Sequence, residues 1–172
     1  SFVETGVVTL AYGATVTANG GITFNSAVSD SVAGTNSLAL SSSGTTTLTG
    51  AVGATALLSI TSNGGGTTAI NGGSAAATTQ TWTNDVSLGV NTTLTGTTVS
   101  FGGTVTGNAH NLPLAMRGAI TLNLDDISGV ANFTNNGGGS TTASGTLTTT
   151  GTQTWTNSVT LGAGTTFDTT GG

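Results

Sequence analysis

The chain contains one ten-residue stretch twice, QTWTNDVSLG at residues 80–89 and QTWTNSVTLG at residues 153–162. Gln80 of the first copy corresponds to Gln153 of the second, which is an offset of 73. A second stretch, TSNGGG at residues 61–66, recurs as TNNGGG at residues 134–139 with the same offset. A long internal repeat is the sequence signature of an architecture built by stacking similar units. The repeat therefore decides which folds have to be considered.

Weaker matches extend the repeat to the beginning of the chain. Val8-Thr9-Leu10 matches Val86-Ser87-Leu88 at an offset of 78, so the first copy is slightly longer than the second. The matches divide the chain into residues 1–78, residues 79–151 and, from 152 to 172, the beginning of a third copy. Because the chain starts and stops inside the repeat, we expect it to be an excerpt of a longer repetitive polypeptide that forms one continuous structure.

Small polar residues dominate the composition. The 172 residues include 41 Thr, 29 Gly, 17 Ser and 14 Asn, whereas charged residues make up only 4%. A single Arg and no Lys cannot neutralise a nucleic-acid backbone, which excludes nucleic acid as a partner. The absence of Cys excludes disulfides and cysteine-ligated metal sites, and no apolar run approaches the length of a membrane helix. We expect no membrane insertion by this segment.

The apolar residues alternate with polar ones over short strings. This period of two is typical of strands with one buried face, and abundant Thr and Val favour extended backbone. The pattern predicts an all-β chain with strands that include residues 86–88, 98–101, 111–114 and 120–124.

Each repeat copy holds five or six short strands separated by Gly, Asn and Ser. A right-handed parallel β-solenoid accounts for this pattern, because short strands then meet at tight corners where Asn-Gly and Gly-Gly supply positive φ angles. Circuits of about 18–25 residues give three or four circuits per copy. The alternative is a series of tandem β-sandwich modules. Such modules are usually about 90–100 residues long, whereas the copies here are offset by only 73 to 78.

Several motifs resemble the repeats of very large secreted bacterial surface proteins, namely filamentous-haemagglutinin-like exoproteins and the passenger domains of autotransporters. The motifs are QTWTN followed by a Val-x-Leu-Gly string, NTTLTG at residues 91–96, VSFGGTV at 99–105 and NGGGTT at 63–68. The resemblance covers essentially the whole chain. It implies an exported β-solenoid that forms a shaft or adheres to surfaces. One departure is Glu4, which stands in the first copy where Trp82 stands in the second.

Residues that could carry catalysis are few. Carbohydrate-active β-helix enzymes need clustered carboxylates, and the only adjacent acids here are Asp125 and Asp126, which we interpret as a solvated corner. No Gly-Gly is followed by the Asp of the calcium-binding nonapeptide repeat. We therefore predict that the chain is not an enzyme, and we assign no catalytic, cofactor-binding or metal-binding residue and no cofactor.

Two further groups of residues are singled out by the sequence. Residues 110–118 hold the only His, Pro, Met and Arg, and we expect His110 and Arg117 to face solvent and Pro113 to lie at a sheet edge or an unpaired point. Trp82 and Trp155 are predicted to occupy equivalent positions with buried rings. Gln80 and Asn84 share their side of the strand and must be hydrogen-bonded there.

Thr-x-Thr pairs raise the alternative of an ice-binding solenoid, in which Thr would recur at the same place on every circuit. In the sequence the pairs recur at the offset of the long repeat instead, so sheet propensity explains them more simply. The favoured function is a non-enzymatic structural segment of a secreted bacterial surface fibre or adhesin shaft. The expected location is the cell surface or extracellular matrix. The expected partners are further repeats of the same chain and neighbouring copies, joined end to end or side by side.

Overall fold

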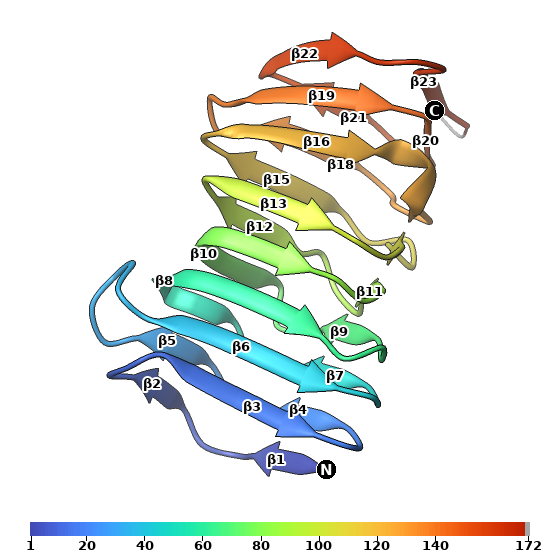
Figure 1. Ribbon diagram of the computed structural model, residues 1–172. Coiled ribbons are helices and arrows are strands. Elements are labelled where there is room, and N and C mark those ends of the chain that lie inside the picture. Colours follow the sequence, from blue (N-terminus) through green and yellow to red (C-terminus); the bar gives the residue numbers. More distant parts are fainter. Residues whose placement is uncertain (171–172) are drawn as a thin grey trace.

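The computed structural model describes residues 1–170, which form one β-solenoid of about eight coils (Figure 1). A coil here means one circuit of the chain around the axis. Every registered strand pair is parallel. The predicted all-β parallel solenoid is therefore confirmed, and tandem sandwiches, whose sheets are antiparallel, are excluded.

Three strands complete one coil, and each lies on its own face. The first face contains β1 (Phe2–Glu4), β4 (Ile22–Phe24), β7 (Thr46–Leu48), β9 (Thr68–Ile70), β11 (Val86–Leu88), β14 (Val105–Thr106), β17 (Ile127–Ser128), β20 (Thr146–Thr149) and β23 (Thr166–Thr169). The second face contains β2 (Val8–Leu10), β5 (Val28–Asp30), β12 (Thr93–Gly96), β15 (Leu112–Met116), β18 (Phe133–Asn136) and β21 (Gln153–Trp155). The third face contains β3 (Ala14–Ala18), β6 (Ser37–Ser42), β13 (Thr98–Phe101), β16 (Ala119–Asn123), β19 (Ser140–Ser144) and β22 (Ser158–Leu161).

Two long strands cross a corner without a break. β8 (Val52–Asn63) and β10 (Ser74–Trp82) each run along both the second and the third face, which joins these faces into one eleven-stranded sheet. A short 3-10 helix, η1 (Leu124–Asp126), forms the corner before β17. The boundary between repeat copies at residues 78 and 79 falls inside β10, so the repeat copies are not separate structural units.

The length of a coil can be read from the strand register. The offset in sequence between register partners is 18 for Thr68 and Val86, and it is 24 for Ile22 and Thr46. Both offsets lie inside the range predicted for one circuit. The variation is accommodated at the corners, where the connections differ in length.

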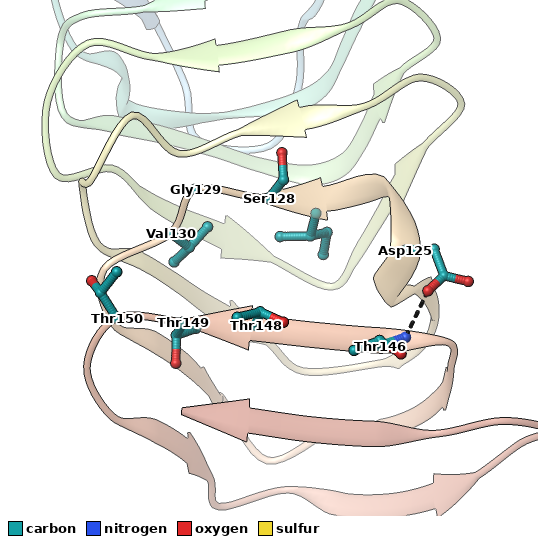
Figure 2. Close-up of a pocket in the computed structure, with 9 residues that line it drawn as sticks. Asp125, Ser128, Gly129, Val130, Thr146, Thr148, Thr149 and Thr150 are labelled. Atoms are coloured by element: carbon teal, nitrogen blue, oxygen red, sulfur yellow. Dashed lines mark hydrogen bonds between the residues drawn. The ribbon is translucent and has the colours of Figure 1, made fainter. Parts of the chain in front are cut away.

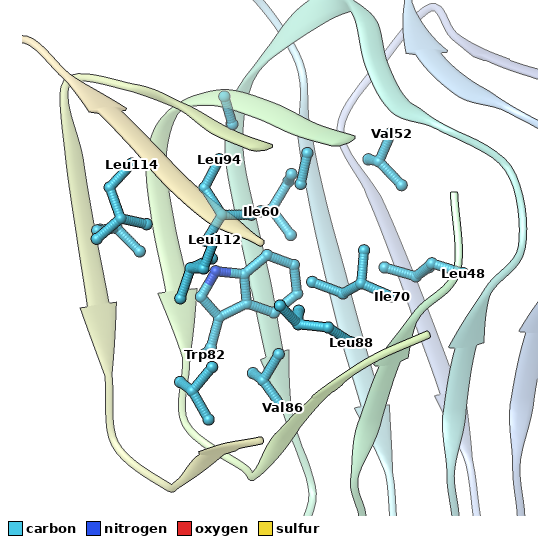
Figure 3. Packing of buried hydrophobic residues seen from close by; sticks show 14 of the residues in the cluster. Leu48, Val52, Ile60, Ile70, Trp82, Val86, Leu88, Leu94, Leu112 and Leu114 are labelled. Atoms are coloured by element: carbon cyan, nitrogen blue, oxygen red, sulfur yellow. The ribbon is translucent and has the colours of Figure 1, made fainter. Parts of the chain in front are cut away.

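The core is a narrow column of inward side chains that runs along the axis. Inward and outward residues alternate along each strand, and the inward set consists mainly of Leu, Ile and Val. Figure 3 shows the fully buried indole of Trp82 among Ile70, Leu88 and Leu112, which come from the first and second faces. Each coil buries its apolar residues only against the coils directly above and below it and across the lumen.

The sequence repeat does not correspond to a whole number of coils. Trp82 lies in the third-face part of β10, whereas Trp155 lies in β21 on the second face. Likewise Val86 is on the first face and Val159 on the third. From β10 to β21 the chain advances eleven strands, or three and two-thirds coils. The prediction that the two Trp residues occupy equivalent positions is therefore wrong, and Trp155 is only half-buried.

The repeat nevertheless preserves local structure. Gly64 and Gly65 have φ angles of 107° and 86°, and their counterparts Gly137 and Gly138 have 111° and 88°. Beside the first pair Ser62 hydrogen-bonds the hydroxyl of Thr68 at 2.7 Å, and beside the second Asn135 Nδ2 donates to Thr141 Oγ1 at 2.7 Å. The same corner is thus built at two different edges of the solenoid. The corner can form at either edge because the strands of every face have the same alternation of inward and outward residues.

The individual strand predictions agree well with the structure. β11 and β13 have the predicted bounds, while β15 begins at Leu112 and β16 ends at Asn123 because η1 takes over at Leu124. Pro113 is not in an edge strand, since β15 pairs with both β12 and β18. Its register with β12 begins at Leu114, directly after Pro113, so the missing N–H falls where that ladder has not yet started.

Candidate functional site

The rare residues of segment 110–118 are not brought together. Arg117 is exposed at the corner between the second and third faces, as predicted, beside a small cavity of about 160 Å³. His110 is half-buried, rather than fully facing solvent, at the other end of β15. Because the length of β15 separates the two side chains, they do not form a joint site.

A groove lies on the first face, where β17 and β20 are out of regular register (Figure 2). Its volume is about 350 Å³, and its lining includes Asp125, Ser128, Val130 and Thr148. Gly129 has a φ of 64°, and Val130 forms an isolated bridge to Thr149, so β17 bulges away from β20 here. The groove is a consequence of this bulge.

The chemistry available in the groove is limited to one carboxylate and several hydroxyls. Asp125 Oδ1 accepts a hydrogen bond from the backbone N–H of Thr146 at 2.8 Å, which ties η1 to the next coil. The neighbouring Asp126 instead accepts a bond from Asn123 Nδ2 at 2.8 Å. The two carboxylates thus have separate local partners, and the arrangement lacks the facing pair of carboxyl groups used in glycoside hydrolysis. That the chain is not an enzyme stays a prediction.

The Gln of the repeated motif has a structural role inside the solenoid. Gln80 Nε2 donates to the carbonyl oxygens of Ala75 at 3.0 Å and Thr95 at 2.9 Å. Gln153 Nε2 donates to Leu147 O at 2.9 Å and Asp168 O at 2.8 Å. In each case Nε2 bonds two carbonyl groups at a corner of the coil, which confirms the predicted hydrogen bonding of Gln80 for Nε2. Oε1 of both residues is buried without a hydrogen-bond partner among the described residues.

Two more side chains of the repeated motif are buried near Gln80: that of Trp82, the last residue of β10, and that of Asn84, just after β10. Asn84 Oδ1 accepts a hydrogen bond from Thr68 Oγ1 at 3.2 Å, as predicted for a buried amide. Asn84 Nδ2 and Trp82 Nε1 have no hydrogen-bond partner within the described residues. Packing rather than hydrogen bonding therefore fixes the indole ring.

One well-organised polar cluster was not predicted from the sequence. The carboxylate of Asp30 is buried and accepts hydrogen bonds from Asn36 Nδ2 at 2.7 Å and from the backbone N–H of Asn36 at 2.8 Å and Thr35 at 3.0 Å. Burial raises the pKa of Asp30, but the bonds from Asn36, Val32 and Thr35 outweigh it and hold the pKa well below its ordinary value. The cluster fixes the loop between β5 and β6. This loop is longer than its counterpart in the second repeat copy, and that extra length was the signal in the sequence from which the cluster could have been predicted.

The third face carries an outward row that the sequence analysis also missed. We call it the hydroxyl row; register partners on successive strands are Thr15, Ala39, Thr61, Thr81 and Ser100 and, beyond the unpaired step from β13 to β16, Thr121, Thr142 and Thr160. Neighbouring coils are about 4.8 Å apart. On this face single Thr residues recur from coil to coil, interrupted by Ala39 and Ser100, but the Thr-x-Thr pairs do not recur at the spacing of a coil, in agreement with the prediction. The third-face segments contain no charged residue.

Residues 1–170 show neither a metal-binding cluster nor a membrane-spanning helix. This part of the chain holds no cluster of three or more His, Cys, Asp or Glu side chains placed to bind a metal ion. Among the same residues no helix has the length and apolar character required to cross a bilayer. The expectations of no cofactor and no membrane insertion remain predictions.

Comparisons with known proteins give no match. Neither the family models nor the curated proteins nor the solved structures include one that matches this chain. The resemblance to secreted bacterial exoproteins therefore rests on the sequence motifs alone.

Proposed function

We propose that this chain is a non-enzymatic structural segment of an extracellular fibre or adhesin shaft on a bacterial surface. The observation that carries the proposal is the stack of about eight coils, in which the second-face ladder runs from β2 to β21 and the ladders of the first and third faces are each interrupted once, between β17 and β20 and between β13 and β16. A shaft needs length and stiffness along one axis. Parallel ladders on three sides of a filled core supply both, because bending would have to break ladder bonds or open the core.

The surface chemistry is consistent with a spacer. The chain has one cationic side chain and a net charge of −5, so it offers little for electrostatic recognition of a partner. The first-face groove has one carboxylate, which is already bonded to Thr146. The repeat also favours a spacer, since a stack can be lengthened by adding coils without changing the existing ones.

Exposure on intact cells tests this role. An antibody raised against the 172-residue chain should label intact, unpermeabilised cells of the organism that produces it. A cytoplasmic protein detected in the same samples serves as the control for leakage. Labelling that appears only after the cells are permeabilised would contradict an extracellular shaft.

Ice binding is the second candidate, and the hydroxyl row is the observation that favours it. Six of its eight members are Thr, interrupted by Ala39 and Ser100, on coils about 4.8 Å apart and on a face whose strands carry no charged residue, an array that can match ordered water. The test is thermal hysteresis of the purified chain. Thr121→Lys in the row should abolish it, whereas Thr95→Lys on the second face should not. No hysteresis in the unmodified chain would exclude this candidate.

A further inference from the structure

A cavity at the corner between the second and third faces is lined in part by the only Arg of a chain that has no Lys. We call it the corner cavity; its volume is about 160 Å³, and its lining includes Arg117 and the three alanines Ala56, Ala76 and Ala77. The lining residues come from four successive coils, those of β8, β10, β12 and β15 (Figure 1). The cation therefore lies beside a hollow and not on a flat part of the surface.

An irregular strand and small side chains create this hollow. Val52 of β8 pairs with Ala75, and Leu57 pairs with Ala77, so the stretch of β8 between them, which contains Ala56, bulges out of the ladder. In the following coil a Cβ on Gly96 would overlap the carbonyl oxygen of Ala77. Alanine and glycine at this corner thus leave space that longer side chains would fill.

Arg117 is positioned by its backbone. Its N–H donates to the carbonyl oxygen of Gly96 at 3.0 Å, and the N–H of Gly118 donates to that of Thr97 at 2.8 Å, so the side chain extends from a fixed point. The carboxylates that accept hydrogen bonds from backbone N–H or side-chain amide groups instead of Arg117 are those of Glu4, Asp30, Asp85, Asp125 and Asp126. The remaining acid, Asp168, lies in β23 on the first face. The guanidinium is therefore available to a carboxylate from outside the chain.

Three threonines, Thr78, Thr95 and Thr97, also line the corner cavity. Thr78 and Thr97 lie in successive coils, because the N–H of Thr97 donates to the carbonyl oxygen of Thr78 at 2.9 Å, and Arg117 lies one coil further along. All three threonines are exposed, and a hydroxyl group can both donate and accept hydrogen bonds. The cavity thus combines one positive charge, several hydroxyl groups and the methyl groups of the alanines.

We propose that the corner cavity binds the carboxylate end of an acidic sugar, such as a hexuronic acid unit of a polysaccharide. Arg117 donates two parallel N–H bonds to the carboxylate, and Thr78 and Thr97 bond the sugar hydroxyls. A single cation matches a singly charged carboxylate better than a phosphate group, which carries up to about two charges. The carboxylate of an acidic peptide would leave the threonine hydroxyls without ligand partners. This inference goes beyond the shaft role and does not depend on it.

Binding at the corner cavity should be weak and short-ranged. The net charge of −5 does not attract anions from a distance, and an exposed ion pair contributes little by itself. The cavity is also smaller than the roughly 300–1,000 Å³ of pockets that enclose a whole ligand, so it holds only the carboxylate and the neighbouring ring atoms. We therefore expect a millimolar dissociation constant that depends on both the charge and the hydroxyl groups of the sugar.

Nuclear magnetic resonance measures this binding directly, because a chain with one Arg gives a single arginine Nε–H signal. Titration with glucuronate at constant ionic strength should shift that signal saturably, together with the backbone amide signals of Thr97 and Gly118. Three ligands separate the contributions: glucuronamide lacks the charge, acetate lacks the hydroxyls, and N-acetylaspartate amide represents an acidic peptide. Each should bind about tenfold more weakly or worse. Binding of acetate or of the peptide analogue as tight as that of glucuronate would overturn the proposal.

Variants test the charge and the hollow separately. Arg117→Gln should abolish the saturable shifts of Thr97 and Gly118, and Arg117→Lys, which keeps the charge but loses the planar fork, should weaken binding several-fold. Ala76→Leu fills the hollow and should weaken binding without changing the charge. Ala69→Leu, at a half-buried outward alanine of β9 on the first face, is the matched control and should bind as the parent does. Undiminished binding by Arg117→Gln, or equal binding by the two leucine variants, would overturn the proposal. Cell-surface labelling tests the shaft role separately.

Discussion

Trp82 and Trp155 stand at the same position of the sequence repeat, but Trp82 lies on the third face of the solenoid and Trp155 on the second. The repeat advances the chain by three and two-thirds coils, so every duplicated strand moves to a neighbouring face. The same stretch of sequence can therefore form a strand on any of the three faces. Duplication in such a chain only has to preserve the order of strand, corner and inward residue.

The two Trp residues should differ in their contribution to stability. Trp82 has no exposed surface and is enclosed by coils on both sides, so Trp82→Ala should lower the free energy of unfolding by about 3–5 kcal/mol. Trp155→Ala should cost about half as much, because half-burial in the last coil leaves a smaller cavity. Urea denaturation followed by circular dichroism measures both values. Equal losses would contradict the asymmetry.

The stacked glycines should tolerate substitution very unequally. A Cβ at Gly66 would overlap the carbonyl oxygen of Gly44 in the preceding coil, whereas a Cβ at Gly65 meets no atom within 4 Å. Gly66→Ala should therefore cost about 3 kcal/mol through overpacking, and Gly65→Ala about 1 kcal/mol through its positive φ alone. The midpoint of thermal unfolding should fall in the same order, and a reversed order would refute this account of the corner.

Loss of the internal amide should destabilise the corner that it bridges. Gln80→Leu leaves the buried carbonyl of Ala75 and the partly buried carbonyl of Thr95 without the amide donor, at a cost of about 1–3 kcal/mol. Thr79→Val, a change of similar volume on the exposed side of the same strand, should alter stability by less than about 0.5 kcal/mol. Hydrogen exchange of the amides in β12 and β13 provides a local readout, and unchanged protection in Gln80→Leu would argue against the bridge.

Acid should weaken the fold through Asp30. Its pKa is lowered in the folded state from an ordinary value of 3.8, so the unfolded chain binds the proton more readily. The resulting stabilisation is present above about pH 4 and is lost as the pH falls further, towards the lowered folded-state pKa. Unfolding in urea at a series of pH values should show this decline. Asp30→Asn should be less stable near neutral pH and should decline less steeply in acid.

Trypsin should cleave the chain only after it unfolds. Arg117 is the single cleavage site, and its side chain is exposed. The backbone on both sides of the scissile bond is held to the preceding coil, because the N–H of Arg117 donates to the carbonyl oxygen of Gly96 at 3.0 Å and the N–H of Gly118 donates to that of Thr97 at 2.8 Å. The folded chain should resist digestion, and denatured chain should give two fragments, residues 1–117 and 118–172. Rapid cleavage without denaturant would show that this corner opens locally.

The sequence by itself determined the strands, the corners and the stacking principle. Alternation around Val86 and Leu88 predicted β11 because that pattern depends only on neighbouring residues. The Asn-Gly pairs predicted corners with positive φ, which is confirmed at Gly64 and Gly137 but is wrong at Gly20 and Gly72. The sequence did not determine which residues lie above one another. The hydroxyl row, the separation of Trp82 from Trp155 and the Asp30 loop all depend on how long each corner is. Corner length sets the register, and a difference such as that between offsets of 18 and 24 becomes visible only when the coils are stacked.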